Sequence, residues 1–159
     1  MVFWLGNGPA RKSGNTAFME RIMSKPSKEF INPKALLSPP GYSHIAKVHG
    51  GTTVYLAGQV SSDASGKLVG AGNFEAQVEQ VFSNLKIAVE AAGGTMADIV
   101  KMNYYLAAEV DQAGVPKLRA IRDRYLNVAS PPASTLVVVT RLAQPGWLIE
   151  IEAVAAIEG

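Results

Sequence analysis

Two glutamates separated by one residue, Glu150 and Glu152, have the clearest potential for chemistry in this sequence. They interrupt an apolar run whose alternate positions are Ile149, Ile151, Ala153, Ala155 and Ile157. This alternation predicts a β-strand over 148–157 with both carboxylates on one face, roughly 6.5–7 Å apart at ~3.3 Å rise per residue. One interpretation is that this face is simply wet, as one side of an antiparallel sheet often is. The other is that it lines a cleft between subunits, where a carboxylate could do acid–base work.

Other chemical motifs are missing from the sequence. Cys is absent, which excludes disulfides, thiolate metal sites and cysteine nucleophiles. The two histidines, His44 and His49, do not stand in a metal-ligand motif, and the sequence has no P-loop and no Gly-x-Ser-x-Gly elbow. We therefore expect no metal and no cofactor. Tyr42 follows Pro-Pro-Gly and could either contact a ligand or pack against the protein.

Composition and charge place the chain among globular proteins. It has 159 residues, of which 48% are hydrophobic and 18% are charged, and no apolar run approaches the ~20 residues that span a bilayer. Residues 1–28 carry five basic side chains against one acidic, a net charge of +4, whereas the remainder has 10 basic and 12 acidic, or −2. Because the domain itself is mildly acidic, we expect no binding of nucleic acid. Because no apolar run could span a bilayer, we expect no membrane partner, and we expect a cytoplasmic location.

The N-terminal segment differs in composition from the rest of the chain. Residues 1–22 are basic, rich in Gly, Asn and Ser, and lack a sustained apolar period. A transit peptide is one interpretation, and an extension or an upstream start before Met23 is the one we prefer. We assign 1–28 to an N-terminal extension and 29–159 to the domain, and expect removal of residues 1–22 to leave the melting temperature unchanged.

Two helices are predicted. Apolar residues at 3–4 spacing indicate a helix over 74–92, which Asn73 caps and Gly93-Gly94 ends. Pro116 favours the first turn of a second helix at roughly 115–126.

The strands complete an order close to βββαβαββ. We expect a hairpin of 43–48 and 52–60 around His49-Gly50-Gly51, a strand over 99–106, and a closing hairpin within 131–157 that turns at Pro-Gly. One sheet with both helices on one face makes an α+β domain.

The second face of the sheet then needs cover. The apolar residues that we assign to it are Leu136, Val138, Leu148 and Val154. Because no further helix is available, we expect another copy of the chain to provide this cover, with clefts between the subunits.

Four motifs in this order resemble the Rid family (reactive intermediate deaminase, formerly YjgF). They are Gly41-Tyr42-Ser43-His44, Ala57-Gly58-Gln59, the helix QVEQVFSNLKIAVEAAG over 77–93, and the closing PPAST…TRL…IEIEAVA. The resemblance covers about residues 29–157. It implies a chorismate-mutase-like α+β fold with a mixed or antiparallel sheet and a homotrimer with three ligand clefts. It also implies hydrolysis of enamines and imines to keto acids and ammonia without metal or organic cofactor.

Residue by residue, the resemblance is mixed. Tyr42 matches the cleft tyrosine, Gly58 the cleft glycine, and Glu150 the acid that positions the attacking water. The carboxylate-binding arginine of the deaminating branch is replaced by Ser134, and a cysteine two places on by Leu136. A serine cannot hold a carboxylate bidentately as a guanidinium does.

Two arginines on the second predicted helix could compensate. Arg119 aligns with a cleft asparagine of the family, and Arg122 follows one turn later. Each could bring a positive charge to the cleft, although we prefer solvated arginines on the outer face of the helix. Ala57 also replaces a cleft serine.

Two functions remain open. The first is a deaminase-like hydrolase that acts on a small enamine or imine other than the usual 2-imino acid, as Tyr42 and Glu150 favour. The second is a non-catalytic trimeric module that binds a small metabolite. Ala57, Ser134 and Leu136 favour either this module or an altered substrate.

Overall fold

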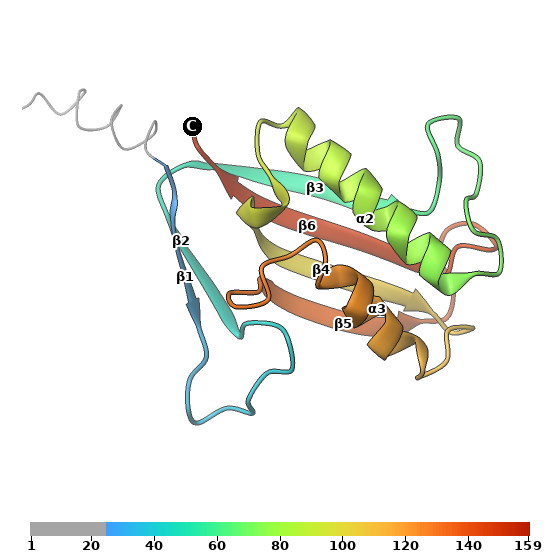
Figure 1. Cartoon of the computed structure of the whole chain (residues 1–159), viewed down its shortest axis with the longest axis horizontal. Coiled ribbons are helices and arrows are strands. Elements are labelled where there is room, and N and C mark those ends of the chain that lie inside the picture. The colour runs from blue at the N-terminus through green and yellow to red at the C-terminus, as the bar shows by residue number, and fades with distance from the viewer. Residues whose placement is uncertain (1–24) are drawn as a thin grey trace, which may run out of the picture.

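The computed structural model describes residues 25–159. The elements are β1 (Ser27–Ile31), β2 (Ile45–His49), β3 (Thr52–Val60), α2 (Phe74–Ala91), the 3₁₀ turn η1 (Met96–Asp98), β4 (Ile99–Ala107), α3 (Gly114–Arg122), β5 (Ala133–Val139) and β6 (Ile149–Ile157). A four-stranded sheet has the order β3-β6-β4-β5, and β1 pairs with β2 in a separate two-stranded sheet. Both helices cover one face of the larger sheet, which confirms the predicted α+β layer (Figure 1).

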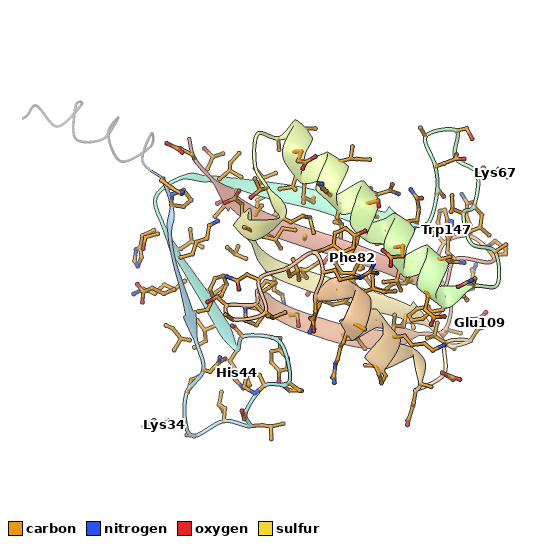
Figure 2. All side chains as sticks on the ribbon, in the orientation of Figure 1. Lys34, His44, Lys67, Phe82, Glu109 and Trp147 are labelled. Carbon is orange, nitrogen blue, oxygen red and sulfur yellow. The ribbon has the colours of Figure 1, made fainter. Side chains whose placement is uncertain are left out.

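Helix α2 forms where its periodicity predicts. The Asn73 side chain accepts a hydrogen bond from the amide of Ala76 at 3.0 Å and so satisfies one free amide of the first turn. Gly93 ends the helix with φ at +86°, a conformation that favours glycine. The apolar stripe contains Val78, Val81, Phe82, Leu85 and Val89, all fully buried. Phe82 lies centrally in the layer between the helices and the sheet (Figure 2).

Gln77 is a fully buried polar residue on the same helix, and the apolar pattern did not predict it. Its amide nitrogen donates to the carbonyls of Gly70 and Gly146, and its amide oxygen accepts from the amide of Leu148. One side chain therefore joins two loops to α2, and its burial is compensated by these three bonds.

Helix α3 is shorter than the expected 115–126. After Arg122 the backbone includes hydrogen bonds that span three residues, as in a 3₁₀ turn. The amide of Tyr125, for example, donates to the carbonyl of Arg122. Tyr125 then stacks on Phe82, with ring centroids 5.0 Å apart. No helix described in residues 25–159 is long and apolar enough to cross a membrane.

The two central strands alternate as predicted. In β6 the alternate residues from Ile149 to Ile157 are buried towards the helices, and in β4 Met102, Tyr104 and Leu106 are buried on the same side. Glu150 and Glu152 therefore occupy the opposite face of the sheet. Neither α2 nor α3 covers this face, which we call the open face (Figure 1).

Both predicted hairpins are wrong. β2 pairs antiparallel with β1, while β3 pairs with β6, although Gly50 and Gly51 do adopt positive φ. At the C-terminus β4 lies between β5 and β6, so these two strands are not neighbours. β6 is the more apolar strand and takes a central position, whereas the exposed β5 runs parallel to β4 at the edge after the α3 crossover.

The assignment of apolar residues to the open face needs correction. Because Leu136 pairs with Tyr104, it points to the helix side, as does Val138, where both lie exposed at the sheet edge. Leu148 precedes β6. Val154 does lie on the open face, opposite the highly exposed Tyr55.

The expectations for residues 1–22 concern residues outside the described part of the chain. The boundary at residue 28 cuts through β1, because Ser27 and Lys28 are its first residues. Lys28 also forms an ion pair with Asp98 at 2.5 Å, which ties this strand to the domain.

Candidate functional site

The loop before β2 brings Tyr42 to the start of β5. Ser43 is buried, its amide donates to the carbonyl of Pro132 at 3.1 Å, and its hydroxyl donates to the carbonyl of Pro131 at 2.7 Å. These bonds align residues 42–43 with the first residues of β5. Tyr42 and Ser134, which are 92 positions apart in the sequence, therefore line the same pocket.

His44 connects this loop to the segment between β1 and β2 through hydrogen bonds. Its ring Nε2 lies 2.7 Å from the carbonyl oxygen of Leu37, and its amide donates to the side-chain oxygen of Asn32 at 2.9 Å. The ring meets that of Tyr42 edge-on, with centroids 5.4 Å apart. The histidine lies in the loop beside β2, as Figure 2 shows, and it fixes the position of the tyrosine.

A pocket of about 260 Å³ lies between this loop, α3 and β5. Its walls include Tyr42, Tyr104, Arg119, Arg122, Ser134 and Leu136. The volume is slightly below the range typical of ligand sites, so it suits a molecule of a few carbon atoms. We call it the α3 pocket.

Both arginines of α3 line this pocket. The Arg122 side chain is only 12% exposed, and its Nε and Nη2 donate to a carboxylate oxygen of Asp123 at 2.9 and 2.7 Å. Gly41 has φ at +86°, and a Cβ there would come within 2.5 Å of Arg122 Nη2. The preference for two solvated arginines is therefore wrong for Arg122, because the close approach of Gly41 and the bond to Asp123 hold it inside. Arg119 is exposed but still reaches the pocket wall.

A second group of predicted site residues lies on the open face. The pairing of β3 with β6 shifts register between Leu56 and Gln59, and Gly58 lies within this bulge. A Cβ on Gly58 would overlap the Glu150 carboxyl group. The glycine therefore leaves the space in which the Glu150 side chain lies across β3.

The two glutamates of the open face have different surroundings. Glu152 accepts hydrogen bonds from Asn103 Nδ2 at 2.6 Å and from the Tyr105 hydroxyl at 3.0 Å. Within residues 25–159 no donor makes a hydrogen bond to the Glu150 carboxylate. Burial, and secondarily the charge of Glu152, raises the pKa of Glu150. Glu150 is thus the carboxylate that is available to exchange a proton, while Glu152 is engaged by its neighbours.

The structure therefore separates the predicted site into two groups within one chain. Tyr42, Ser134 and Arg119 meet in the α3 pocket, on the helix side at the β5 edge. Gly58 and Glu150 lie on the other side of the sheet, towards the β3 edge.

Sequence reasoning missed several residues of both groups. It did not assign Tyr104 to the site, yet this side chain lines the α3 pocket. Burial raises its pKa strongly, so the hydroxyl stays protonated and donates to Met102 Sδ at 3.2 Å. The partners of Glu152, Asn103 and Tyr105, alternate on one strand, which was a signal that they share a face, but only the strand register brings them to Glu152.

Comparisons with known proteins agree with this architecture. The family model for Endoribonuclease L-PSP matches residues 33–157. A 2-iminobutanoate/2-iminopropanoate deaminase of Dermatophagoides farinae is 30% identical over 135 residues, which cover 80% of this chain and 100% of that protein. A RutC family protein of Pyrococcus abyssi is 34% identical over 130 residues, or 81% of this chain and 97% of the relative.

Solved structures support the same conclusion. A Rid-family protein of unknown function from Yersinia pestis is 35% identical, with a TM-score of 0.75 over 82% of this chain and 98% of that one. RidA from an Antarctic Psychrobacter is 36% identical, with a TM-score of 0.59 over 80% of this chain and 98% of that one. The fold, the order of motifs and these matches together show that the chain belongs to the Endoribonuclease L-PSP family, also known as the Rid or YjgF family.

Proposed function

We propose that this protein is a homotrimeric hydrolase of the deaminase type, which acts on a small enamine or imine without metal or organic cofactor. The observation that carries the proposal is the state of Glu150. Its carboxylate lies in the space left by Gly58, accepts no hydrogen bond within residues 25–159, and has a raised pKa. A carboxylate with these properties is suited to taking a proton from water.

The reaction needs one water molecule and a movable proton. Glu150 orients the water and accepts a proton as the oxygen attacks the imine carbon, and the C=N bond becomes a C–N single bond. Glu150 returns this proton to the nitrogen, which gives a carbinolamine. When the C–N bond of the carbinolamine breaks, Glu150 passes the hydroxyl proton to the nitrogen, so that ammonia leaves and a C=O bond forms. An enamine enters the same route after it takes up a proton at carbon to give the imine. Tyr42 contacts the ligand, and backbone amides near Gly58 polarise it.

The separation of the site residues supports assembly. Tyr42 and Ser134 lie on the helix side of the sheet at one edge, whereas Glu150 lies on the open face towards the other. A ligand cannot touch both groups of one chain through a packed sheet. A cleft between neighbouring copies would join the α3 pocket of one subunit to Glu150 of the next, as the family resemblance implies.

The substrate is proposed to differ from that of the deaminating relatives. A relative from Dermatophagoides farinae is named a 2-iminobutanoate/2-iminopropanoate deaminase, which supports the reaction type. In this chain Ser134 and Leu136 occupy the strand positions at which the resemblance expects an arginine and a cysteine. Loss of a guanidinium partner costs a buried carboxylate on the order of 2–5 kcal/mol, so 2-imino acids should be poor substrates.

A screen of neutral and acidic enamines and imines tests the proposal. They are generated in place, for example 2-iminobutanoate from threonine by a dehydratase, and hydrolysis is followed by release of ammonia. The native protein should hydrolyse 2-iminobutanoate slowly and at least one other substrate faster. Glu150→Gln should abolish this activity while the circular dichroism spectrum stays native.

Glu152→Gln is the matched control, because the new amide oxygen can still accept from Asn103 and Tyr105. It should retain most of the activity, and equal loss in both variants would refute the role given to Glu150.

Ser134→Arg alone should restore little activity towards 2-iminobutanoate, because Leu136 gives the new side chain no polar support. The alternative, a non-catalytic binding module, is favoured by Ser134 and Leu136. It would be supported if no compound is hydrolysed while a small molecule raises the melting temperature.

A further inference from the structure

Glu150 lies between two strands that leave its side chain different amounts of room. On the β4 side, the antiparallel register puts Tyr105 directly opposite Glu150. Side chains of such a pair have Cβ atoms only about 4.5–5.5 Å apart, so the tyrosine borders the carboxylate. On the β3 side, Gly58 has no side chain, and the Glu150 carboxyl group lies in the space that a Cβ would fill. Glu150 therefore has a wall on one side and an opening on the other.

The Tyr105 side chain is anchored at its far end. Its hydroxyl donates to Glu152 Oε1 at 3.0 Å, two residues further along β6. Asn103, which the register pairs with Glu152, donates to the same oxygen at 2.6 Å. The tyrosine therefore leans along the strands from the level of Glu150 to the level of Glu152, and this bond fixes its ring in the space over β4.

The two glutamates are consequently drawn in opposite directions. Both donors to Glu152 belong to β4, whereas the carboxyl group of Glu150 lies over β3. Glu150 accepts no hydrogen bond from residues 25–159, so the shape of its surroundings determines where it lies. A bulky side chain that fills the space over β4 leaves the gap at Gly58 as the place for the carboxylate.

We propose that Tyr105 is a positioning residue for Glu150, because its anchored ring closes the space over β4 and directs the carboxylate into the gap at Gly58. The inference rests on the proposed function, since it names the residue that holds the proposed base in place. Gly58 supplies the room, and Tyr105 removes the alternative position. In this role Tyr105 acts through Glu150 and contacts no reacting atom.

Steady-state rates test this role with the compound that the native protein hydrolyses fastest in the substrate screen. Tyr105→Ala opens the space over β4, so Glu150 should leave the gap at Gly58. A displacement of about 1 Å can cost about 100-fold, so kcat should fall about 10–100-fold while KM stays unchanged. Tyr105→Phe keeps the ring and should retain most of the rate. Circular dichroism checks that both variants are folded.

Titration of the Glu150 carboxyl group tests the same role without any hydrolysis. The measurement is NMR of protein whose glutamates are labelled at the side-chain carboxyl carbon, with the Glu150 signal assigned from its absence in Glu150→Gln. Burial is the main cause of the raised pKa of Glu150, and the charge of Glu152 is the second. Loss of the ring exposes the carboxylate, so its pKa should fall towards the ordinary glutamate value in Tyr105→Ala and stay raised in Tyr105→Phe.

Asn103→Ala is the matched control, because it removes the other donor to Glu152 and leaves the ring beside Glu150. It should keep the native kcat and the raised pKa of Glu150. The proposal is overturned if Tyr105→Phe or Asn103→Ala changes both quantities as much as Tyr105→Ala does. A lowered pKa of Glu150 in Tyr105→Ala, without hydrolysis of any screened compound by the native protein, would support the positioning role and reject the proposed enzyme. Hydrolysis that depends on Glu150, with kcat and pKa both native in Tyr105→Ala, would do the reverse.

Discussion

At the scale of single residues, Glu150 and Glu152 lie on one strand face but differ in their hydrogen-bond partners and surroundings. The side chains of Asn103 and Tyr105 both donate hydrogen bonds to Glu152. The hydrogen bond to Glu152, as the largest cause, raises the pKa of Tyr105 and keeps that donor protonated. Glu150 is partly withdrawn from water beside a like charge, and the pKa of its carboxyl group is raised.

The raised pKa of Glu150 predicts a specific pH dependence of stability. Because the folded state holds this proton more tightly than the unfolded state, stability falls as the pH rises from the ordinary glutamate pKa through the raised one. Glu150→Gln removes the titrating group and therefore this loss of stability at high pH. The melting temperature of the variant relative to native should therefore be higher at pH 7 than at pH 4, by on the order of 1–3 °C because solvent screens the group. Differential scanning calorimetry at both values checks this, and an equal difference at the two would contradict it.

At the scale of elements, the bulge in β3 decides where Glu150 lies. The register of β3 against β6 changes between Leu56 and Gln59, and Gly58 within the bulge leaves room for the carboxylate of the neighbouring strand. Gly58 does not have a positive φ, so alanine would suit its backbone. The demand for glycine comes from the approach of Glu150 and not from the local chain conformation.

Gly58→Ala should lower the hydrolytic activity while it leaves the stability of the fold nearly unchanged. The new Cβ meets the end of a flexible side chain, so Glu150 moves and the fold remains. A displacement of about 1 Å can lower a rate about 100-fold, whereas we expect the melting temperature to change by no more than about 3 °C. Rates from the substrate screen and thermal melts of Gly58→Ala, Glu150→Gln and the double variant measure this. The double variant should be no slower than Glu150→Gln, and full activity in Gly58→Ala would count against the bulge argument.

At the scale of the whole molecule, one face of the sheet is left uncovered by the helices of residues 25–159. Helices α2 and α3 lie on the other side (Figure 1). Tyr55 is 81% exposed on the open face, with Val154 beside it, and the predicted site residues are divided between the two sides of the sheet. A second copy that covers this face would bury Tyr55 and could complete the cleft.

Assembly therefore predicts a mass three times the 16.8 kDa of one chain at micromolar concentration. Tyr55→Lys should shift the protein towards monomer, because a charge would be buried without a partner. Ile87→Lys is the control, since Ile87 is also exposed but lies on α2. Light scattering coupled to size exclusion measures all three proteins. A native mass near 17 kDa, or dissociation by Ile87→Lys and not by Tyr55→Lys, would disprove this assembly through the open face.

The sequence by itself determined the features that depend on near neighbours. The alternation along β6, the apolar stripe of α2 and its Asn73 cap follow from side-chain period and local hydrogen bonding. The same periodicity put Glu150 and Glu152 on one face, and the order of motifs identified the family.

Only the tertiary structure decided which strands pair and which side chains meet. The two expected hairpins failed because strand order depends on buried apolar area across the whole sheet, which puts β6 in the centre and β5 at the edge. The burial of Arg122 depends on a glycine 81 positions earlier, and the engagement of Glu152 depends on the register of β4. Contacts between residues far apart in the chain arise from packing, which no local pattern in a single sequence encodes.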